Sequence, residues 1–467
     1  MIDYKAAEDN REQRIVNIRT IHSRNYVPKQ KKHIPIDPKI YDMILDDFSK
    51  CNYEALFNNL SKLTFYYKHS DSIIPPSFDF TNFIGQCLTI ENSPNVVKQS
   101  IKLLVHLFYA ESLGFSKEFS NSPKKEEILN QLLILLNDQN YIELVLKCLK
   151  NMTGGSIEER DFVLNKLSFQ TIFEKQHNSE DSPIEKNIQF LRCKLIHNYC
   201  RYKVSVKDGK EIMIQSISLF PTLENRSKIE LIYSITHLRQ FLLIDWIKTL
   251  KYNGLLNPIL TGLVLDDPEL TIATFLLLFT LMKDREPIDF DCEYLSQLLL
   301  SENPINVQIG CWSIDQIILL DYSSTMADKF VSNGIFAIIL NLFENGSYEI
   351  KIEAAFALCS FVEQDLTNYC DLIINSNIIG NFLDFFGTPL ESSLIVRIIE
   401  SINKIFEKYE KRNLIDVCRN QFLENEGNTI FEEFTFDDNE DIAGPASIFM
   451  SNFIDQIIQP DDENDDD

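Results

Sequence analysis

Residues 333–364 read NGIFAIILNLFENGSYEIKIEAAFALCSFVEQ, and this stretch predicts two antiparallel helices. Asn333 and Gly334 indicate a turn, because glycine adopts positive φ without steric cost. A short apolar helix is expected over 335–343 and a longer one over 348–362, whose apolar residues recur at helical spacing. Such a hairpin cannot bury its apolar side alone, so it predicts neighbours of the same kind.

Related stretches lie on both sides of this hairpin. Residues 253–284 align with it without gaps, 80 positions upstream, which is about two periods of an armadillo-type repeat. In the repeat between them Trp312 aligns with Phe356. In the repeat after them Asn377 replaces Gly334, and asparagine is among the residues that best tolerate positive φ. The pattern predicts an all-α fold, a right-handed armadillo-repeat superhelix, or α-solenoid.

The repeats are expected to occupy residues 41–458 and to number about nine to ten. The last unit, residues 427–458, is atypical, as terminal repeats are when they cap a core. Pro445 is expected at the start of its final helix. Residues 459–467 are expected to form an acidic disordered tail.

Composition and motifs exclude several classes of function. The net charge of −25 argues against nucleic-acid binding and favours basic partners. Ten cysteines without a CxxC pair or zinc-type cluster predict reduced core thiols in the nucleus or cytosol. The longest apolar run, 272–282, is too short to span a bilayer, and no apolar signal region opens the sequence. Without a catalytic triad, HExxH or phosphate-binding loop, neither an enzyme nor a cofactor or metal site is expected.

Residues 1–40 form a distinct basic segment. Between positions 11 and 32 seven cations face one anion, Glu12. The cations are Arg11, Arg14, Arg19, Arg24, Lys29, Lys31 and Lys32. Two interpretations stay open: a solvated basic tail, or a segment that folds on an acidic partner.

In its repeats the chain resembles importin-α, the armadillo-repeat adaptor of nuclear import. That family carries Trp-x-x-x-Asn pairs on its inner helices, where the tryptophans hold lysine stems of a cargo and the asparagine amides hold its backbone. The spacing places both residues on one helix face. By position, the resemblance implies a peptide-binding groove formed by Trp312, Gln316, Phe356, Ser360, Asn151, Asn198, Tyr233 and His237.

Several positions depart from the family pattern. The tryptophan position holds Lys102, Lys147 and Lys194 in the first three repeats, and His106 replaces the first asparagine. Because lysines occupy equivalent positions, we expect Trp312 to be exposed in the groove rather than buried in the core. Free ammonium groups would repel a basic peptide, so such peptides are expected to prefer the C-terminal half, at Trp312 and Phe356.

The resemblance implies a nuclear import adaptor in cytoplasm and nucleus. Its partners would be basic nuclear localisation signals in the groove, importin-β on the seven cations of residues 1–40, and a nuclear export receptor at the acidic last repeat. Neither nucleic acid nor membrane is expected as a partner. The alternative is an armadillo scaffold with lost or altered cargo specificity.

Overall fold

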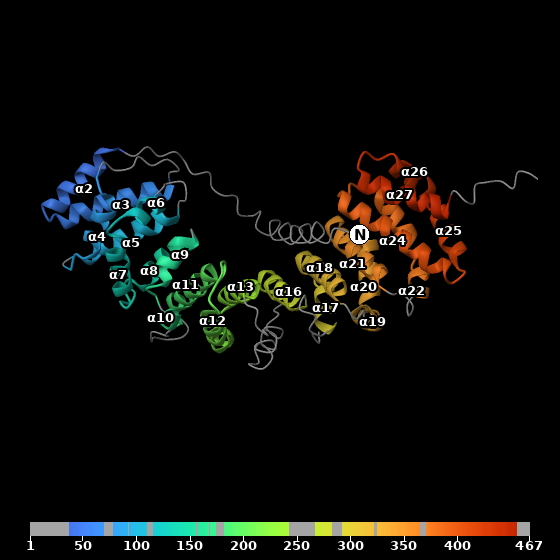
Figure 1. The fold of residues 1–467 in the computed structure, drawn as a ribbon, viewed down its shortest axis with the longest axis horizontal. Helices are drawn as coiled ribbons and strands as arrows, with labels where there is room; N and C mark the ends of the chain where they lie inside the picture. Colours follow the sequence, from blue (N-terminus) through green and yellow to red (C-terminus); the bar gives the residue numbers. More distant parts are fainter. Residues whose placement is uncertain are drawn as a thin grey trace, which may run out of the picture. The chain divides into compact units, whose positions relative to one another are not determined.

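The regular elements of the computed structural model are all helices in the part of the chain it describes (Figure 1). The described residues are 37–69, 78–91, 93–109, 115–155, 157–167, 169–173, 182–241, 267–282, 292–321, 325–364 and 370–454. They fall into two compact units: the N-terminal unit ends at Leu277 and the C-terminal unit begins at Leu278. Residues 1–36 of the basic segment, the acidic tail and residues 253–266 of the aligned repeat lie outside the described residues.

The N-terminal unit is a succession of short and long helices. In order these are α2 (Lys39–Ser49), α3 (Tyr53–His69), α4 (Phe80–Leu88), α5 (Pro94–Tyr109), α6 (Phe115–Asn121), α7 (Lys125–Leu135), α8 (Ile142–Gly154), α9 (Ile157–Leu164), α10 (Phe169–Phe173), α11 (Pro183–Cys200), α12 (Val206–Leu219), the 3-10 turn η2 (Phe220–Thr222), α13 (Asn225–Phe241) and most of α16 (Pro268–Met282). The long helices α3, α5, α8, α11 and α13 pack one against the next.

The start of α11 shows how sequence sets these boundaries. The Ser182 hydroxyl accepts a hydrogen bond from the Glu185 N–H, and Pro183 occupies the first turn, where its missing N–H costs nothing. Farther along the helix, Leu195 and Ile196 are completely buried. Burying a side chain of this size stabilises the fold by about 1.5–3 kcal/mol. The stack is therefore held mainly by apolar faces.

The C-terminal unit repeats a set of three helices. Its helices are α17 (Cys292–Leu299), α18 (Pro304–Leu320), α19 (Thr325–Ser332), α20 (Ile335–Asn345), α21 (Tyr348–Glu363), α22 (Cys370–Asn375), α23 (Ile378–Phe386), α24 (Ser392–Glu410), α25 (Ile415–Glu424), α26 (Gly427–Thr435) and α27 (Glu440–Phe453). From α19 onward each repeat ends in a long helix, and α18, α21, α24 and α27 pack in succession. Three-helix repeats stacked through their third helices are of the armadillo type, so the predicted all-α solenoid is confirmed.

The two positions that were predicted to reach positive φ do so. Gly334 has φ of 76° and Asn377 has φ of 50°, both in the left-handed region. Each immediately precedes the second helix of its repeat, α20 or α23. The asparagine therefore performs the same turn as the glycine, and the predicted register between these repeats is confirmed.

The predicted place of Pro445 is wrong. Helix α27 already begins at Glu440, because the Asn439 side chain accepts a hydrogen bond from the Asp441 N–H at 3.1 Å. Pro445 lies inside the helix instead. Among the described helices none is by itself long and apolar enough to cross a membrane, although the pair α19 and α20, bent by 76°, passes that test together.

The turn at Asn377 yields a stability prediction. We expect Asn377→Ala to lower the free energy of unfolding by about 1 kcal/mol, because the alanine Cβ is strained at positive φ. Asn377→Gly is the matched control and should stay within about 0.5 kcal/mol of the parent. Urea titrations followed by far-UV circular dichroism would measure both, and equal midpoints for alanine and glycine would contradict the assignment.

Candidate functional site

The predicted groove residues all lie on the long, stacked helices. Asn151 is on α8, Asn198 on α11, and Tyr233 and His237 on α13, in the N-terminal unit. In the C-terminal unit Trp312 and Gln316 lie on α18, and Phe356 and Ser360 on α21. The structure thus gathers them into two groups, one in each unit.

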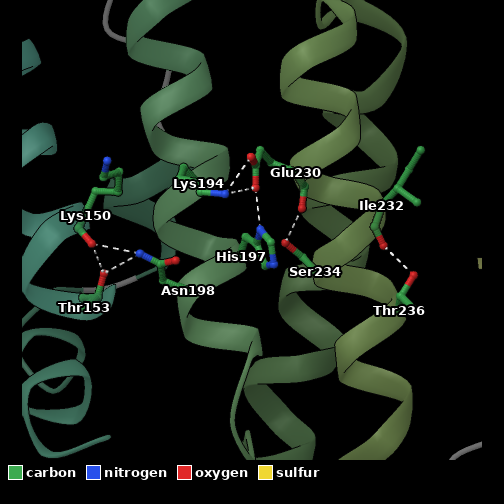
Figure 2. Close-up of polar contacts among 9 residues, drawn as sticks. All are labelled: Lys150, Thr153, Lys194, His197, Asn198, Glu230, Ile232, Ser234 and Thr236. Carbon is green, nitrogen blue, oxygen red and sulfur yellow. Dashed lines mark hydrogen bonds and ion pairs between the residues drawn. The ribbon is translucent and has the colours of Figure 1, made fainter. Parts of the chain in front are cut away.

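The polar residue of the predicted pair repeatedly bonds to the preceding long helix. Asn151 Nδ2 donates to the carbonyl of Val105 at 2.7 Å, and Asn198 Nδ2 donates to the carbonyl of Lys150 at 2.8 Å (Figure 2). Ser360 Oγ lies 3.5 Å from the carbonyl of Asp315. In the preceding repeat, each of these donors aligns with one residue, and the accepting carbonyl belongs to the residue just before that one. The donors predicted to hold a cargo backbone therefore hold the neighbouring repeat.

Asn198 is the most enclosed of these amides in the N-terminal unit. Its side chain is 6% exposed, and its Nδ2 also lies 3.4 Å from Thr153 Oγ1. A Cβ added to Gly154 would stand 3.3 Å from this nitrogen, so the glycine leaves the room that the amide uses. Asn198 is a contact between repeats rather than an exposed amide of a groove.

Glu230 of α13 bonds to two side chains of α11, Lys194 and His197 (Figure 2). Lys194 Nζ lies 2.8 and 2.9 Å from its two carboxylate oxygens, and His197 Nδ1 contacts one of them. Burial alone would raise the pKa of Glu230, but His197 and Lys194 outweigh it and hold that pKa below its usual value. Glu230 thus stays a carboxylate and bonds α13 to α11.

Two further rings complete this cluster. The His197 ring stacks on Tyr233, with centroids 5.6 Å apart, and on His237, with centroids 5.3 Å apart. Burial, then His197 and Arg201, lower the pKa of His237 to about 4. His237 is therefore neutral at pH 7. The predicted pair Tyr233 and His237 does lie together, and its rings face the preceding repeat.

The prediction that Lys147 and Lys194 would repel a basic peptide through their ammonium groups is wrong. Lys147 Nζ lies 2.5 Å from Glu143 Oε1, which also accepts from Asn187 Nδ2 at 2.8 Å. Lys194 is paired with Glu230. Each of these charges has a carboxylate close by, so the expected repulsion of a basic peptide largely disappears.

The predicted exposure of Trp312 is also wrong, because its side chain is only 2% exposed. The Phe279 ring packs edge-on against the indole with centroids 5.0 Å apart, and helix α18 is apolar around most of its circumference. Phe356 is 6% exposed, and the Arg397 guanidinium lies 5.6 Å from its ring centroid. Both rings are parts of the core, so neither offers a slot to the stem of a partner's lysine.

Gln316 and Ser360 belong to a buried ionic network across three long helices. Its centre is Asp315 of α18, which is 0% exposed. Asp315 accepts from Gln316 Nε2 at 3.0 Å, from Ser360 Oγ at 2.6 Å and from Arg397 Nη1 at 2.9 Å. Arg397 of α24 also donates to Ser360 Oγ and, at 3.0 Å, to Glu363 Oε1. The network connects α18, α21 and α24.

Sequence reasoning missed the charged centres of both clusters, Glu230 and Asp315 with Arg397. A signal was present, since Asp315 interrupts the apolar run 311–320 and Arg397 interrupts 394–399. A charge inside an apolar helix indicates a paired, buried group. The sequence does not indicate its partner, because Asp315 and Arg397 are 82 positions apart.

The described residues contain no group of three or more His, Cys, Asp or Glu side chains arranged to hold a metal ion. The contact of His197 with Glu230 is the nearest to a catalytic pair in this cluster, but its other neighbours are Lys194 and two rings. What the arrangement does is hold successive helices together.

Comparison with known proteins gives likeness of fold. No protein-family model and no curated protein matches the sequence. One similar solved structure comes from work on a phosphorylation switch that controls the interaction between cadherin and β-catenin; it has 12% identity and a TM-score of 0.49, over 80% of this chain and 69% of that one. A designed armadillo repeat protein has 12% identity and a TM-score of 0.34, over 60% of this chain and 98% of its own.

The buried network predicts a strong asymmetry between single and double substitutions. Arg397→Met should lower the free energy of unfolding by about 3–5 kcal/mol, because it removes a partner from the fully buried Asp315. Adding Asp315→Leu should recover much of this loss, since the uncompensated charge is then gone. Lys411→Met, at an exposed residue that ends the same helix, is the control. Denaturant unfolding of these variants and of Asp315→Leu alone measures the coupling, and additive losses from the two single substitutions would refute the network.

Proposed function

We propose that this chain is an armadillo-type scaffold that binds a protein partner, with a specificity different from that of importin-α. The observation that carries the proposal is the internal use of the groove residues. Trp312 and Phe356 are buried, while Gln316 and Ser360 bond within the ionic network. The basic peptide recognised by the import family would find no tryptophan slot at these positions.

The long-helix face of the N-terminal unit, formed by α5, α8, α11 and α13, is the better candidate surface. It presents half-buried polar side chains in successive repeats, whereas the equivalent positions of α18 and α21 in the C-terminal unit are buried. These side chains are Lys102, His106, Lys147, Lys150, Asn151, Lys194, His197, Tyr233 and His237. Repetition of polar and aromatic groups along stacked helices is how solenoids form extended binding surfaces.

A position-specific cross-linking experiment tests this surface. A photo-reactive amino acid at Lys102, on the long-helix face, should capture a discrete partner protein from cell extract. The same group at Ile134, which is 62% exposed on α7, serves as the control. Capture at Lys102 and not at Ile134 would support the proposal. Equal capture at both positions, or capture at Ile134 alone, would count against it.

Nuclear import remains a second candidate on one observation, the seven cations against one anion over residues 11–32 of a chain with net charge −25. Such a segment suits an acidic partner such as importin-β. We expect binding to weaken as salt rises, because exposed charges are screened over ~8 Å at physiological ionic strength.

Pull-downs with purified importin-β provide the measurement for this candidate. The intact chain should bind, and the chain without residues 1–40 should not. A matched variant, with the seven cations replaced by glutamine, separates charge from the rest of the segment. Unchanged binding after the deletion would eliminate the import role without affecting the scaffold proposal.

A further inference from the structure

Lys150 of α8 differs from the lysines around it. Lys147 is paired with Glu143, and Lys194 with Glu230. The ammonium group of Lys150 makes no hydrogen bond or ion pair with any described residue, although its side chain is half-buried. Figure 2 shows this ammonium pointing away from the bonds that join Lys194, His197 and Glu230. A cation in this setting has lost part of its hydration without gaining a partner.

The charges around Lys150 make its isolation more costly. Burial, then Lys194 and Lys147, lower the pKa of Lys150, while Glu230 acts in the opposite direction. Glu230, the carboxylate that acts on Lys150, is already engaged by Lys194 and His197. Lys147 and Lys194 are each paired with a carboxylate, whereas the ammonium group of Lys150 is paired with no described residue. An external anion would neutralise Lys150.

We propose that an acidic segment of a partner protein docks on the long-helix face of the N-terminal unit and places an aspartate or glutamate carboxylate against Lys150. This inference rests on the scaffold function proposed above and names the chemistry of its partner. Charge complementarity selects the occupant, since a local excess cation stands out on a chain of net charge −25. Lys102, at the equivalent face of α5, offers a second cation one repeat away.

A carboxylate fits this position better than a phosphate group. One unpaired ammonium group matches the single negative charge of a carboxylate, whereas a phosphate at neutral pH carries ~1.5–2. The surplus negative charge of a phosphate would be repelled by Glu230. Basic peptides are excluded for the complementary reason, because their cations would meet Lys150.

Fluorescence anisotropy with the full chain tests the proposal. The probe is a fluorescein-labelled twelve-residue peptide with aspartate or glutamate at alternate positions, and the matched probe has glutamine at those positions. Lys150→Gln should weaken binding of the acidic probe about fivefold, and Lys150→Glu more than tenfold. Lys207→Glu, at an exposed lysine of α12 in the same unit, is the charge-matched control and should change the affinity less than twofold.

Folding and competing ligands are controlled in the same series. Lys150→Gln should unfold no earlier than the parent, because it removes an unpaired, partly desolvated charge. Equal losses of affinity for the acidic probe in Lys150→Glu and Lys207→Glu would overturn the proposal. Binding of a serine-phosphorylated probe or of a basic probe more tightly than the acidic probe would also overturn it. Tighter binding of the acidic probe after deletion of residues 459–467 would also overturn it, by assigning Lys150 to the chain's own tail.

The cross-linking experiment keeps the two proposals separable. If a partner is captured at Lys102 but Lys150→Glu does not change the affinity for the acidic probe, the scaffold function is supported and the proposed acidic segment is refuted. Absence of capture at Lys102, with binding of the acidic probe that depends on Lys150, would refute the proposed partner while confirming an anion-binding residue.

Discussion

One recurring hydrogen bond sets the register of the long helices: a polar side chain of one helix donates to a backbone carbonyl of the helix before it. It joins Asn151 to Val105 and Asn198 to Lys150, and a longer contact joins Ser360 to Asp315. A helical carbonyl has a second lone pair that can accept such a bond. Apolar burial stabilises the stack without direction, so these directional contacts decide how far one repeat may slide along the next.

Charged groups on the long helices are covered to different extents in the two units. In the N-terminal unit the lysines and histidines are only partly covered, and their carboxylate partners come from a neighbouring turn or repeat. In the C-terminal unit the charges of Asp315 and Arg397 are enclosed, and Phe356 lies beneath the guanidinium. Enclosed charges rigidify a core, whereas partly covered charges stay accessible to solvent. The two units therefore differ in how far the polar groups of their long helices are covered.

The resemblance to importin-α predicted the register of residues along the helices, but it did not predict which side chains are buried. The resemblance placed Trp312, Gln316, Phe356 and Ser360 in register, and the structure keeps that register. The side chains of Trp312 and Phe356, however, pack in the core, and those of Gln316 and Ser360 bond within the ionic network. A spacing fixes the face of a helix on which a residue lies, but the neighbouring repeat decides whether that face is covered.

The sequence by itself determined the helices, the turns and the order of repeats, because these depend on local physics. Periodic apolar residues predicted α20 and α21, and the tolerance of asparagine for positive φ predicted the turn at Asn377. Only the tertiary structure decided that Trp312 is buried, that Glu230 joins Lys194 to His197, and that Asp315 meets Arg397. Exposure and charge pairing depend on residues tens of positions away, which come together only when one repeat packs against another.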